Sequence, residues 1–127
     1  MNKIIFLLVS LLMCLPACAE WVSYQRNADT EEFFDPSSVK REQGQVKLWT
    51  LTNYATPITS LEGQELFSEK SLTTLDCGAK KIGVEKMTKH AAKNGQGALV
   101  ATMETTLRMT KVRIDSPDQI LIERLCR

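Results

Sequence analysis

The sequence predicts an α+β domain: a mainly antiparallel β-sheet with a C-terminal helix packed on it and one disulfide. Three observations support this fold class. Apolar and polar residues alternate along most of the chain after residue 20, as they do in half-buried strands. The last segment, "DSPDQILIERLCR", begins with helix-start signals, and two cysteines remain in the expected mature protein.

The first 19 residues have the three parts of a bacterial secretory signal. A polar start with Lys3 precedes an apolar run at residues 4–15, which is shorter than the about 20 residues that a transmembrane helix needs. Ala17 and Ala19 supply the small residues that a signal peptidase inspects, so we expect cleavage before Glu20 and export. The alternative is a lipoprotein cut, after which a lipidated Cys18 would anchor the protein to a membrane.

The expected products are a signal peptide, residues 1–19, and one domain, residues 20–127. No repeat or internal linker divides the mature chain, and its length suits a single core. Cys77 and Cys126 remain after cleavage, and in an oxidising compartment such a pair is most simply one disulfide. No further cysteine pair or histidine cluster completes a four-ligand metal site. We therefore expect no metal and no cofactor.

The clearest strand is "QVKLWTLTNY", residues 45–54, which we expect to lie centrally and to end near Pro57. Other strands are expected in "WVSYQR" and in "EEFFDPSSV" up to the Asp35-Pro36 turn. "LFSEKSLTTLDC" and "KKIGVEKMTKHA" follow, joined near Gly78, and "ALVATMETTLRMTKVRI" continues extended. The segment "VEKMTKHAAK" also has helical composition, but the hairpin signal Asn94-Gly95 favours a strand.

The expected terminal helix has Ser116 as its N-cap, Pro117 at its first position and Asp118 near the positive end of the dipole. Helical spacing predicts that three apolar side chains face the sheet and that Cys126 lies close enough to reach Cys77. These three side chains are Ile120, Leu121 and Leu125.

Charge divides the chain into two halves, although the total is almost balanced. Residues 20–69 carry nine acids and four bases, whereas residues 70–127 carry six acids and eleven bases. The balance excludes a generally basic nucleic-acid-binding protein. The halves either neutralise each other within one sheet or leave a basic run free for an acidic partner.

The basic run is the candidate binding site, and it contains five lysines within fourteen residues. Strand alternation predicts that Lys81, Lys89 and Lys93 project from one face and Lys80 and Lys86 from the other. The alternative role is a solvated edge strand that discourages aggregation.

No residue pattern predicts catalysis. The single histidine, His90, has no evident partner for acid–base work, and we expect it at the solvated surface. Trp21 and Trp49 form either an aromatic recognition platform or part of the core, and we expect Trp49 in the core. We therefore assign no catalytic residue and predict that the protein is not an enzyme.

The order and spacing of several motifs resemble the bacterial surface-adhesin protein E family over nearly the whole mature chain. The motifs are "FFDPSSV", "VKLWTLTNYATP", "SEKSLTTLDC", "NGQGALV" and "DSPDQILIERLC". The resemblance implies a β domain with a packed helix and one disulfide, exported to the periplasm or outer surface of a Gram-negative bacterium. It also implies adhesion to host extracellular-matrix or plasma proteins.

The chain departs from this family at two places. It has "RMTKVRID" where the family often has a tryptophan and a proline, and it has Lys89 and His90 where aromatic residues are common. The hypothesis is therefore an exported, non-enzymatic binding domain with adhesin-like contacts. The alternative is a structural envelope protein that self-associates, as a homo-oligomer, through an exposed edge strand and has no host ligand.

Overall fold

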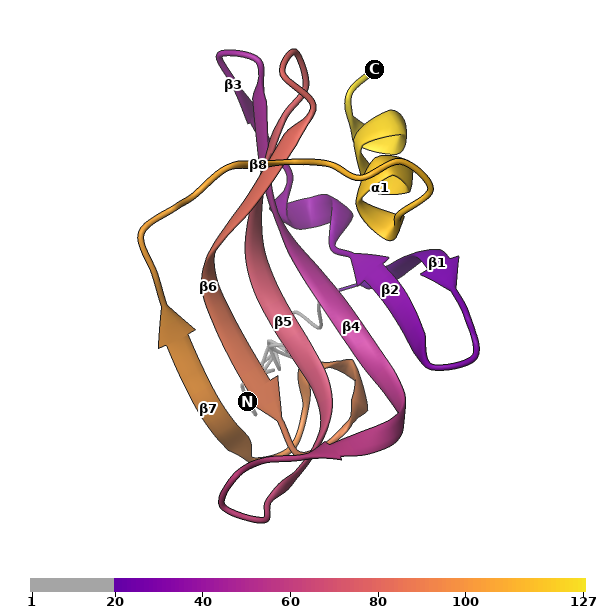
Figure 1. Cartoon of the computed structure of the whole chain (residues 1–127), viewed down its shortest axis with the longest axis vertical. Coiled ribbons are helices and arrows are strands. Elements are labelled where there is room, and N and C mark those ends of the chain that lie inside the picture. The colour runs from indigo at the N-terminus through magenta and orange to yellow at the C-terminus, as the bar shows by residue number, and fades with distance from the viewer. Residues whose placement is uncertain (1–19) are drawn as a thin grey trace, which may run out of the picture.

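A single antiparallel sheet forms most of the domain in a computed structural model that describes residues 20–127 (Figure 1). The six strands of its main path occur in the order β1-β2-β4-β5-β6-β7. Two short strands extend it, because β3 pairs with β4 and β8 pairs with β6. The strands are β1 (Val22–Arg26), β2 (Thr30–Phe34), β3 (Lys40–Glu42), β4 (Gln45–Thr59), β5 (Glu65–Asp76), β6 (Lys81–His90), β7 (Leu99–Glu104) and β8 (Thr110–Lys111).

The long hairpin of β4 and β5 is the centre of the sheet, as the alternation of residues 45–54 predicts. Pairing runs from Gln45 opposite Asp76 to Asn53 opposite Ser68, and resumes at Ile58. The expected end of the strand near Pro57 is wrong, because β4 continues to Thr59. Pro57 is tolerated since it lies in the interval without β5 pairs, where no ladder hydrogen bond from its nitrogen is needed.

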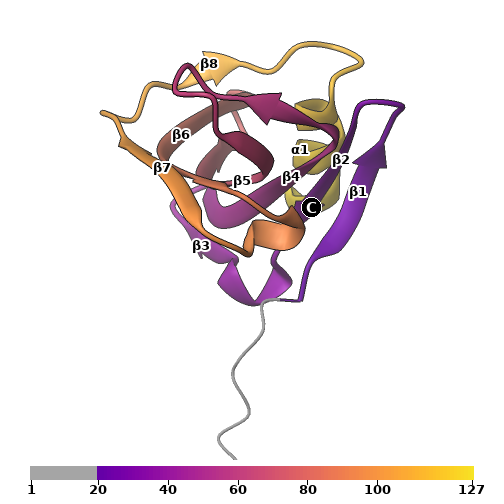
Figure 2. The ribbon, with the colours of Figure 1, turned by 90° about the horizontal axis from the view of Figure 1, so that it is seen from below.

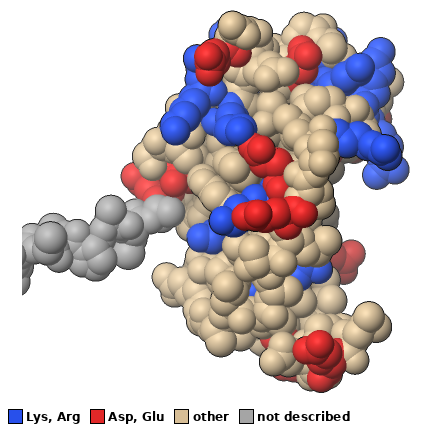
Figure 3. All heavy atoms as spheres, turned by 90° about the vertical axis from the view of Figure 1, so that its left-hand side faces the viewer, with Lys and Arg blue, Asp and Glu red and all other residues tan. Residues whose placement is uncertain are grey.

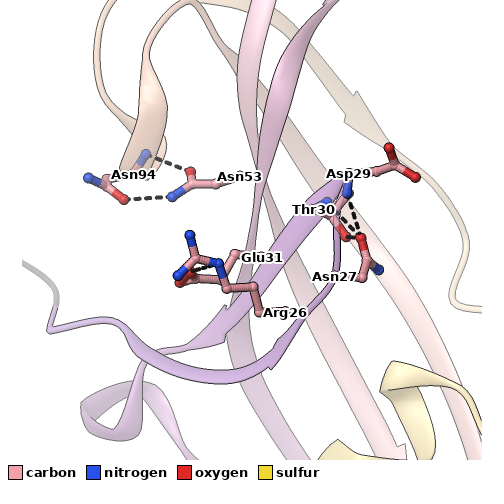
Figure 4. A network of polar contacts seen from close by, with 7 residues as sticks. All are labelled: Arg26, Asn27, Asp29, Thr30, Glu31, Asn53 and Asn94. Carbon is pink, nitrogen blue, oxygen red and sulfur yellow. Dashed lines mark hydrogen bonds and ion pairs between the residues drawn. The ribbon is translucent and has the colours of Figure 1, made fainter.

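The turns at the first strands are fixed by short polar side chains. Between β1 and β2, the Asn27 side-chain carbonyl accepts hydrogen bonds from the Asp29 and Thr30 amides at 2.8 and 2.9 Å (Figure 4). After β2, Asp35 caps the 3₁₀ helix η1 (Pro36–Ser38) and accepts from the Ser37 amide at 2.9 Å. The predicted Asp-Pro turn is therefore confirmed.

The predicted terminal helix is α1 (Pro117–Leu125), and it packs on β1. Figure 2 shows α1 beside β2 and β1. Ser116 is the N-cap, and its hydroxyl accepts a hydrogen bond from the Gln119 amide at 3.3 Å. The buried core combines this helix with the upper part of the sheet and consists of Phe34, Val46, Leu48, Leu75, Leu121, Ile122 and Leu125.

The inward face of α1 differs from the prediction at one residue. Leu121 and Leu125 are buried as expected, but Ile120 is exposed and Ile122 takes its place in the core. Cys126 lies four residues after Ile122, so both lie on the same stripe of the helix. Because Cys126 is bonded to Cys77 at the end of β5, the side of α1 that bears Ile122 and Cys126 faces the sheet.

The predicted disulfide joins Cys77, at the end of β5, to Cys126, at the end of α1, with 5.4 Å between the Cα atoms. Arg41 of β3 also donates a hydrogen bond to the carbonyl of Leu125. Neither α1 nor any other helix within residues 20–127 is long and apolar enough to cross a membrane. The predicted signal peptide and its cleavage site lie outside the described residues.

The ambiguous segment after Gly78 forms β6, so the helical alternative is wrong. The residues 91–98 then connect β6 to its antiparallel neighbour β7, and Asn94 and Gly95 have φ angles of 64° and 68°. Such left-handed conformations explain the Asn-Gly pair. The expected extended run at residues 98–114 contains only β7 and β8 as strands.

Candidate binding surface

The basic run lies along β6 and its two ends, and β6 is not an edge strand. It pairs with β5 on one side and with β7 and β8 on the other, so the edge-strand alternative is wrong. A ten-residue strand extends over about 30 Å at about 3.3 Å per residue. Lys80 before the strand and Lys93 in η2 (Lys93–Gly95) after it are therefore far apart.

A β-bulge in β6 changes which lysines share a face. Val84 lies opposite Thr73, but Lys86 lies opposite the next residue of β5, Leu72, so Glu85 is an extra residue. Lys81 and Lys86 therefore project from the same face of the sheet, the one opposite the core. Lys89 projects from the other face, so the face assignment from simple alternation is wrong.

Several of these lysines have charged neighbours. The Lys86 ammonium lies 3.7 Å from Glu104 of β7, and Glu85 forms an ion pair with Lys47 of β4. Lys81 is directly opposite Lys111 of β8, a like-charged pair that the sequence pattern did not reveal. Figure 3 shows that Lys and Arg side chains gather mainly in the upper half of this side of the molecule, with acidic side chains among them.

His90 lies inside the protein and not at the solvated surface, so that expectation is wrong. It is 8 % exposed, and its Nε2 atom lies 2.8 Å from the Thr88 hydroxyl. Burial, with a smaller effect of the Lys70 charge, lowers its pKa. Ser68 is opposite His90 in the sheet, but its hydroxyl donates to the Ala92 carbonyl and accepts from the Gly95 amide. The two side chains are therefore not arranged as a nucleophile and its base.

Both tryptophans are half-buried and lie outside the main core. Trp49 projects from the face opposite Leu48, where the Lys70 ammonium lies 5.7 Å from its ring centroid. The expectation that Trp49 packs in the core is thus wrong. A cation over an indole face is a favourable contact, and it leaves part of the ring accessible to a partner.

The face toward α1 carries a polar hollow of about 480 Å³ below the core. Its lining includes hydroxyl groups of Thr50, Thr52, Ser71 and Thr73 and carboxylates of three elements: Glu32 of β2, Glu69 of β5 and Asp118 of α1. The hollow is a feature that the sequence analysis missed, because its residues occupy inward-facing positions where alternation predicts apolar side chains.

Burial controls the protonation of this hollow. It raises the pKa of Glu32, although the Thr52 hydroxyl donates a 2.6 Å hydrogen bond that favours the charged form. Burial also raises the pKa of Asp118, against the attraction of Arg113. Tyr24 has a raised pKa mainly through burial, and burial raises the pKa of Tyr54 to about 12. The carboxylates of Glu32 and Asp118 therefore take up a proton more readily than carboxylates at an open surface.

Within residues 20–127, no three His, Cys, Asp or Glu side chains gather as ligands for a metal ion.

Comparison with protein families identifies the group to which this domain is related. The model of the surface-adhesin protein E family matches residues 21–127. The chain belongs to this family. The resemblance noted from the motifs is therefore confirmed, and the match spans almost the whole described domain.

Solved structures share its fold. Haemophilus influenzae protein E superposes with a TM-score of 0.67 at 14 % identity, covering 84 % of this chain and 83 % of that one. A second crystal form of the same protein gives a TM-score of 0.70 at 13 % identity, with 84 % and 86 % covered. A comparison with curated protein sequences finds no match.

Proposed function

We propose that this protein is an exported, non-enzymatic adhesin of the Gram-negative cell envelope that contacts host or extracellular macromolecules. The observation that carries the proposal is the match to the surface-adhesin protein E family over residues 21–127. The expected partners are host extracellular-matrix or plasma proteins. Export is expected because residues 1–19 have the pattern of a secretory signal.

The proposed contact surface is the face of β6 that bears Lys81 and Lys86, together with Lys80 at the adjoining turn. Lys81 and Lys86 share this face because of the bulge, and Lys111 of β8 adds a charge opposite Lys81. Lys89 projects from the opposite face, and Lys93 lies beyond the end of β6 in η2, so neither belongs to this surface. The partner's complementary surface is acidic.

Individual ion pairs on such a surface are weak. Each exposed pair contributes about 0–1 kcal/mol, so attraction must arise from several lysines together. It should weaken as added salt shortens the Debye length from about 10 Å at 0.1 M. A strong dependence of binding on salt is therefore expected.

A binding assay on the domain tests the contact surface. Residues 20–127 are captured on a sensor and exposed to a panel of extracellular-matrix and plasma proteins at several salt concentrations. The variant K81E/K86E should lose binding, whereas R26E/R127E, with the same charge change on β1 and after α1, should retain it. Equal affinity and salt dependence in both folded variants would reject this face.

Surface exposure is tested separately in the native cell. Protease shaving of intact cells should release peptides of residues 20–127, and intact-mass analysis should show a chain that begins at Glu20 without lipid. Recovery of the protein only after the outer membrane is opened would contradict a surface adhesin. A diacyl or triacyl mass on Cys18 would show membrane anchoring.

One observation favours the second candidate function, a self-associating envelope protein. β7 is an outer strand of the main sheet and carries the exposed apolar side chains Leu99 and Met103, with 58 % and 46 % of their surfaces exposed. An unpaired edge of this kind can pair with another chain. Light scattering after chromatography would show a homo-oligomer that dissociates in the variant L99K/M103K if this function holds.

A further inference from the structure

A second hollow lies beside the disulfide and has a volume of about 430 Å³. Three segments form its walls: the turn between β5 and β6, the chain that follows β8, and the side of α1 that bears Gln119, Ile122 and Glu123. The volume is in the range of about 300–1,000 Å³ that is usual for small-molecule sites. Its lining residues are Gly78, Ala79, Lys80, Lys111, Val112, Arg113, Ile114, Gln119, Ile122 and Glu123.

The interior of this hollow is apolar. Ile122 of α1 is 6 % exposed and connects the hollow to the core, and Val112 and Ala79 line it from the two loops. Ile114 stands at 83 % exposure and lies in the chain just after β8. An apolar body placed here would remove Ile114 from water, which is favourable in proportion to the area covered.

Basic side chains dominate the charge of the lining. Lys80, Lys111 and Arg113 contribute three positive charges, and within residues 20–127 none of the three forms a salt bridge. The lining acid, Glu123, accepts a hydrogen bond from the Gln119 side chain at 3.1 Å. A carboxylate that reached Lys80 and Lys111 would gain charge-assisted hydrogen bonds.

Other charged groups around the hollow leave this excess in place. Lys81 lies opposite Lys111 and adds positive charge, but on its other side it faces Asp76, whose carboxylate also accepts a hydrogen bond from the Ala79 amide at 3.0 Å. Asp118 attracts Arg113 from the side of the polar hollow. Asp115 donates its amide to the Gln119 side chain at 2.7 Å and does not line the hollow. The balance at Lys80 and Lys111 is therefore positive.

Covalent and hydrogen bonds hold the walls in place. The disulfide joins Cys77, next to Gly78 of the turn, to Cys126 at the end of α1. The Val112 amide donates to the Lys80 carbonyl at 3.0 Å and joins the remaining wall to the turn. A site whose walls are fixed in advance loses less conformational entropy when it binds a ligand.

We propose that this hollow binds an amphiphilic carboxylate, a molecule with one carboxylate group on an apolar alkyl body. The carboxylate lies between Lys80 and Lys111, and the alkyl body covers Val112, Ile114 and Ile122. An inorganic anion would leave the apolar lining in water, and a neutral amphiphile would leave the lysines without a counter-charge. The site shares Lys80 and Lys111 with the proposed adhesive surface, but it needs neither Lys86 nor a macromolecular partner, so decanoate binding tests it separately from adhesion.

Calorimetric titration of residues 20–127 with decanoate, below its micelle concentration, tests the site. We expect saturable binding of one decanoate, and binding of inorganic phosphate or octyl glucoside at least about tenfold weaker, as the loss of one charged hydrogen bond implies. The variant K80Q/K111Q should lose about tenfold in affinity, whereas K89Q/K93Q, with the same charge change elsewhere, should match the wild type. Absence of saturable binding, or equal affinity in the two variants, would overturn the proposal.

Two further measurements test the site. The first asks whether the carboxylate comes from a free molecule or from a lipid surface, and the second asks whether binding depends on the disulfide that fixes the walls. Sedimentation with phosphatidylglycerol vesicles should leave the protein in solution, and binding to vesicles without binding to decanoate would overturn the proposal in favour of a membrane surface. The variant C77S/C126S should bind decanoate more weakly while α1 remains folded by circular dichroism. Unchanged affinity in this variant would show that the hollow does not depend on the tied walls.

Discussion

Asn53 of β4 and Asn94 of the β6–β7 connection exchange two hydrogen bonds. The Asn53 side-chain amide donates to the Asn94 side-chain oxygen, and the Asn94 backbone amide donates to the Asn53 side-chain oxygen, each at 2.8 Å (Figure 4). The next amide, that of Gly95, donates to Ser68 of β5 at 2.9 Å. Residues 91–98 are thus attached to the central hairpin and not only to their own strands.

Loss of this pair should loosen the connection. The variant N53A removes both hydrogen bonds and should lower the free energy of unfolding by about 1–3 kcal/mol, at about 0.5–1.5 kcal/mol for each bond. N94G keeps the backbone donor and suits the left-handed φ of 64° at this position, so it should be milder than N94A. Urea unfolding gives the energies, and hydrogen exchange of residues 91–98 locates the effect. Equal losses in N94G and N94A would contradict the role of the backbone conformation.

The strands and the helix follow from local sequence patterns, but the register does not. The alternation at residues 45–54 and the turn signals Asp35-Pro36 and Asn94-Gly95 predict strands and turns correctly, because each depends on a few neighbouring residues. The bulge at Glu85 has no such signature, since it arises from the fit between β5 and β6. Because of this one extra residue, Lys86 lies on the same face of the sheet as Lys81, whereas strict alternation predicts that the two lie on opposite faces.

The candidate sites were less predictable than the fold because they combine distant residues. The run around Lys80 is visible in the sequence, but its neighbour Lys111 is brought there by β8, a strand of only two residues. His90 looks solvated among lysines, yet it is buried opposite Ser68, whose hydroxyl is bonded to the β6–β7 connection. In each case the surroundings of the side chain depend on a segment that is distant in the sequence, and composition and periodicity do not predict which segment that is.

The buried carboxylate of Glu32 should make stability depend on pH. Its pKa is raised in the folded protein, so folding favours the protonated form, and this contribution is present at low pH and is lost as the pH rises through the raised pKa. Between the ordinary pKa and the folded one, the unfolding free energy of the wild type should therefore fall with rising pH. The variant E32Q should show a flatter profile in the same window.

Two other groups with shifted pKa values, Asp118 and His90, also make stability depend on pH, so the comparison of wild type with E32Q must allow for them. Asp118 has a raised pKa and acts in the same direction as Glu32, whereas the lowered pKa of His90 destabilises the fold as pH falls. Subtracting the E32Q profile from that of the wild type, by urea unfolding from pH 4 upward in steps, removes the His90 contribution and leaves the titration of Glu32 together with its coupling to Asp118. A difference independent of pH would contradict the burial of this carboxylate.

Removal of the disulfide should destabilise the domain and loosen α1 first. The variant C77S/C126S should lose about 2–5 kcal/mol of unfolding free energy, because the unfolded chain gains freedom over the enclosed loop. The residues of α1 should show the largest increase in hydrogen exchange, while β4 and β5 remain protected by their pairing. Two free thiols in properly exported protein, found by non-reducing peptide mapping, would show that the bond does not form in the cell.

Gly83 lies where the chain after β7 covers β6, and a side chain there should be poorly tolerated. A Cβ atom at this position would lie 2.8 Å from the Arg108 carbonyl oxygen, from the Leu107 side chain and from the Met109 sulfur. The first of these is backbone and cannot rotate away, so G83A should lower the unfolding free energy by about 1–3 kcal/mol, as overpacking does. G78A is the matched control, because the Cβ atom would meet only the Asp76 carboxylate, at 3.8 Å.

The same substitution tests what holds residues 105–109, the segment between β7 and β8, against β6: contact with Gly83 or the segment's own hydrogen bonds. If this segment is held against β6 by contact with Gly83, G83A should raise hydrogen exchange at residues 105–111 and leave residues 45–54 protected. The attachment of β8 would weaken with it, so Lys111 would move away from Lys81 and Lys80, and decanoate affinity should fall in G83A relative to the wild type. A stable G83A protein with unchanged exchange would mean that the segment is positioned by its own hydrogen bonds, such as that from the Thr105 amide to the Glu85 carbonyl at 3.0 Å.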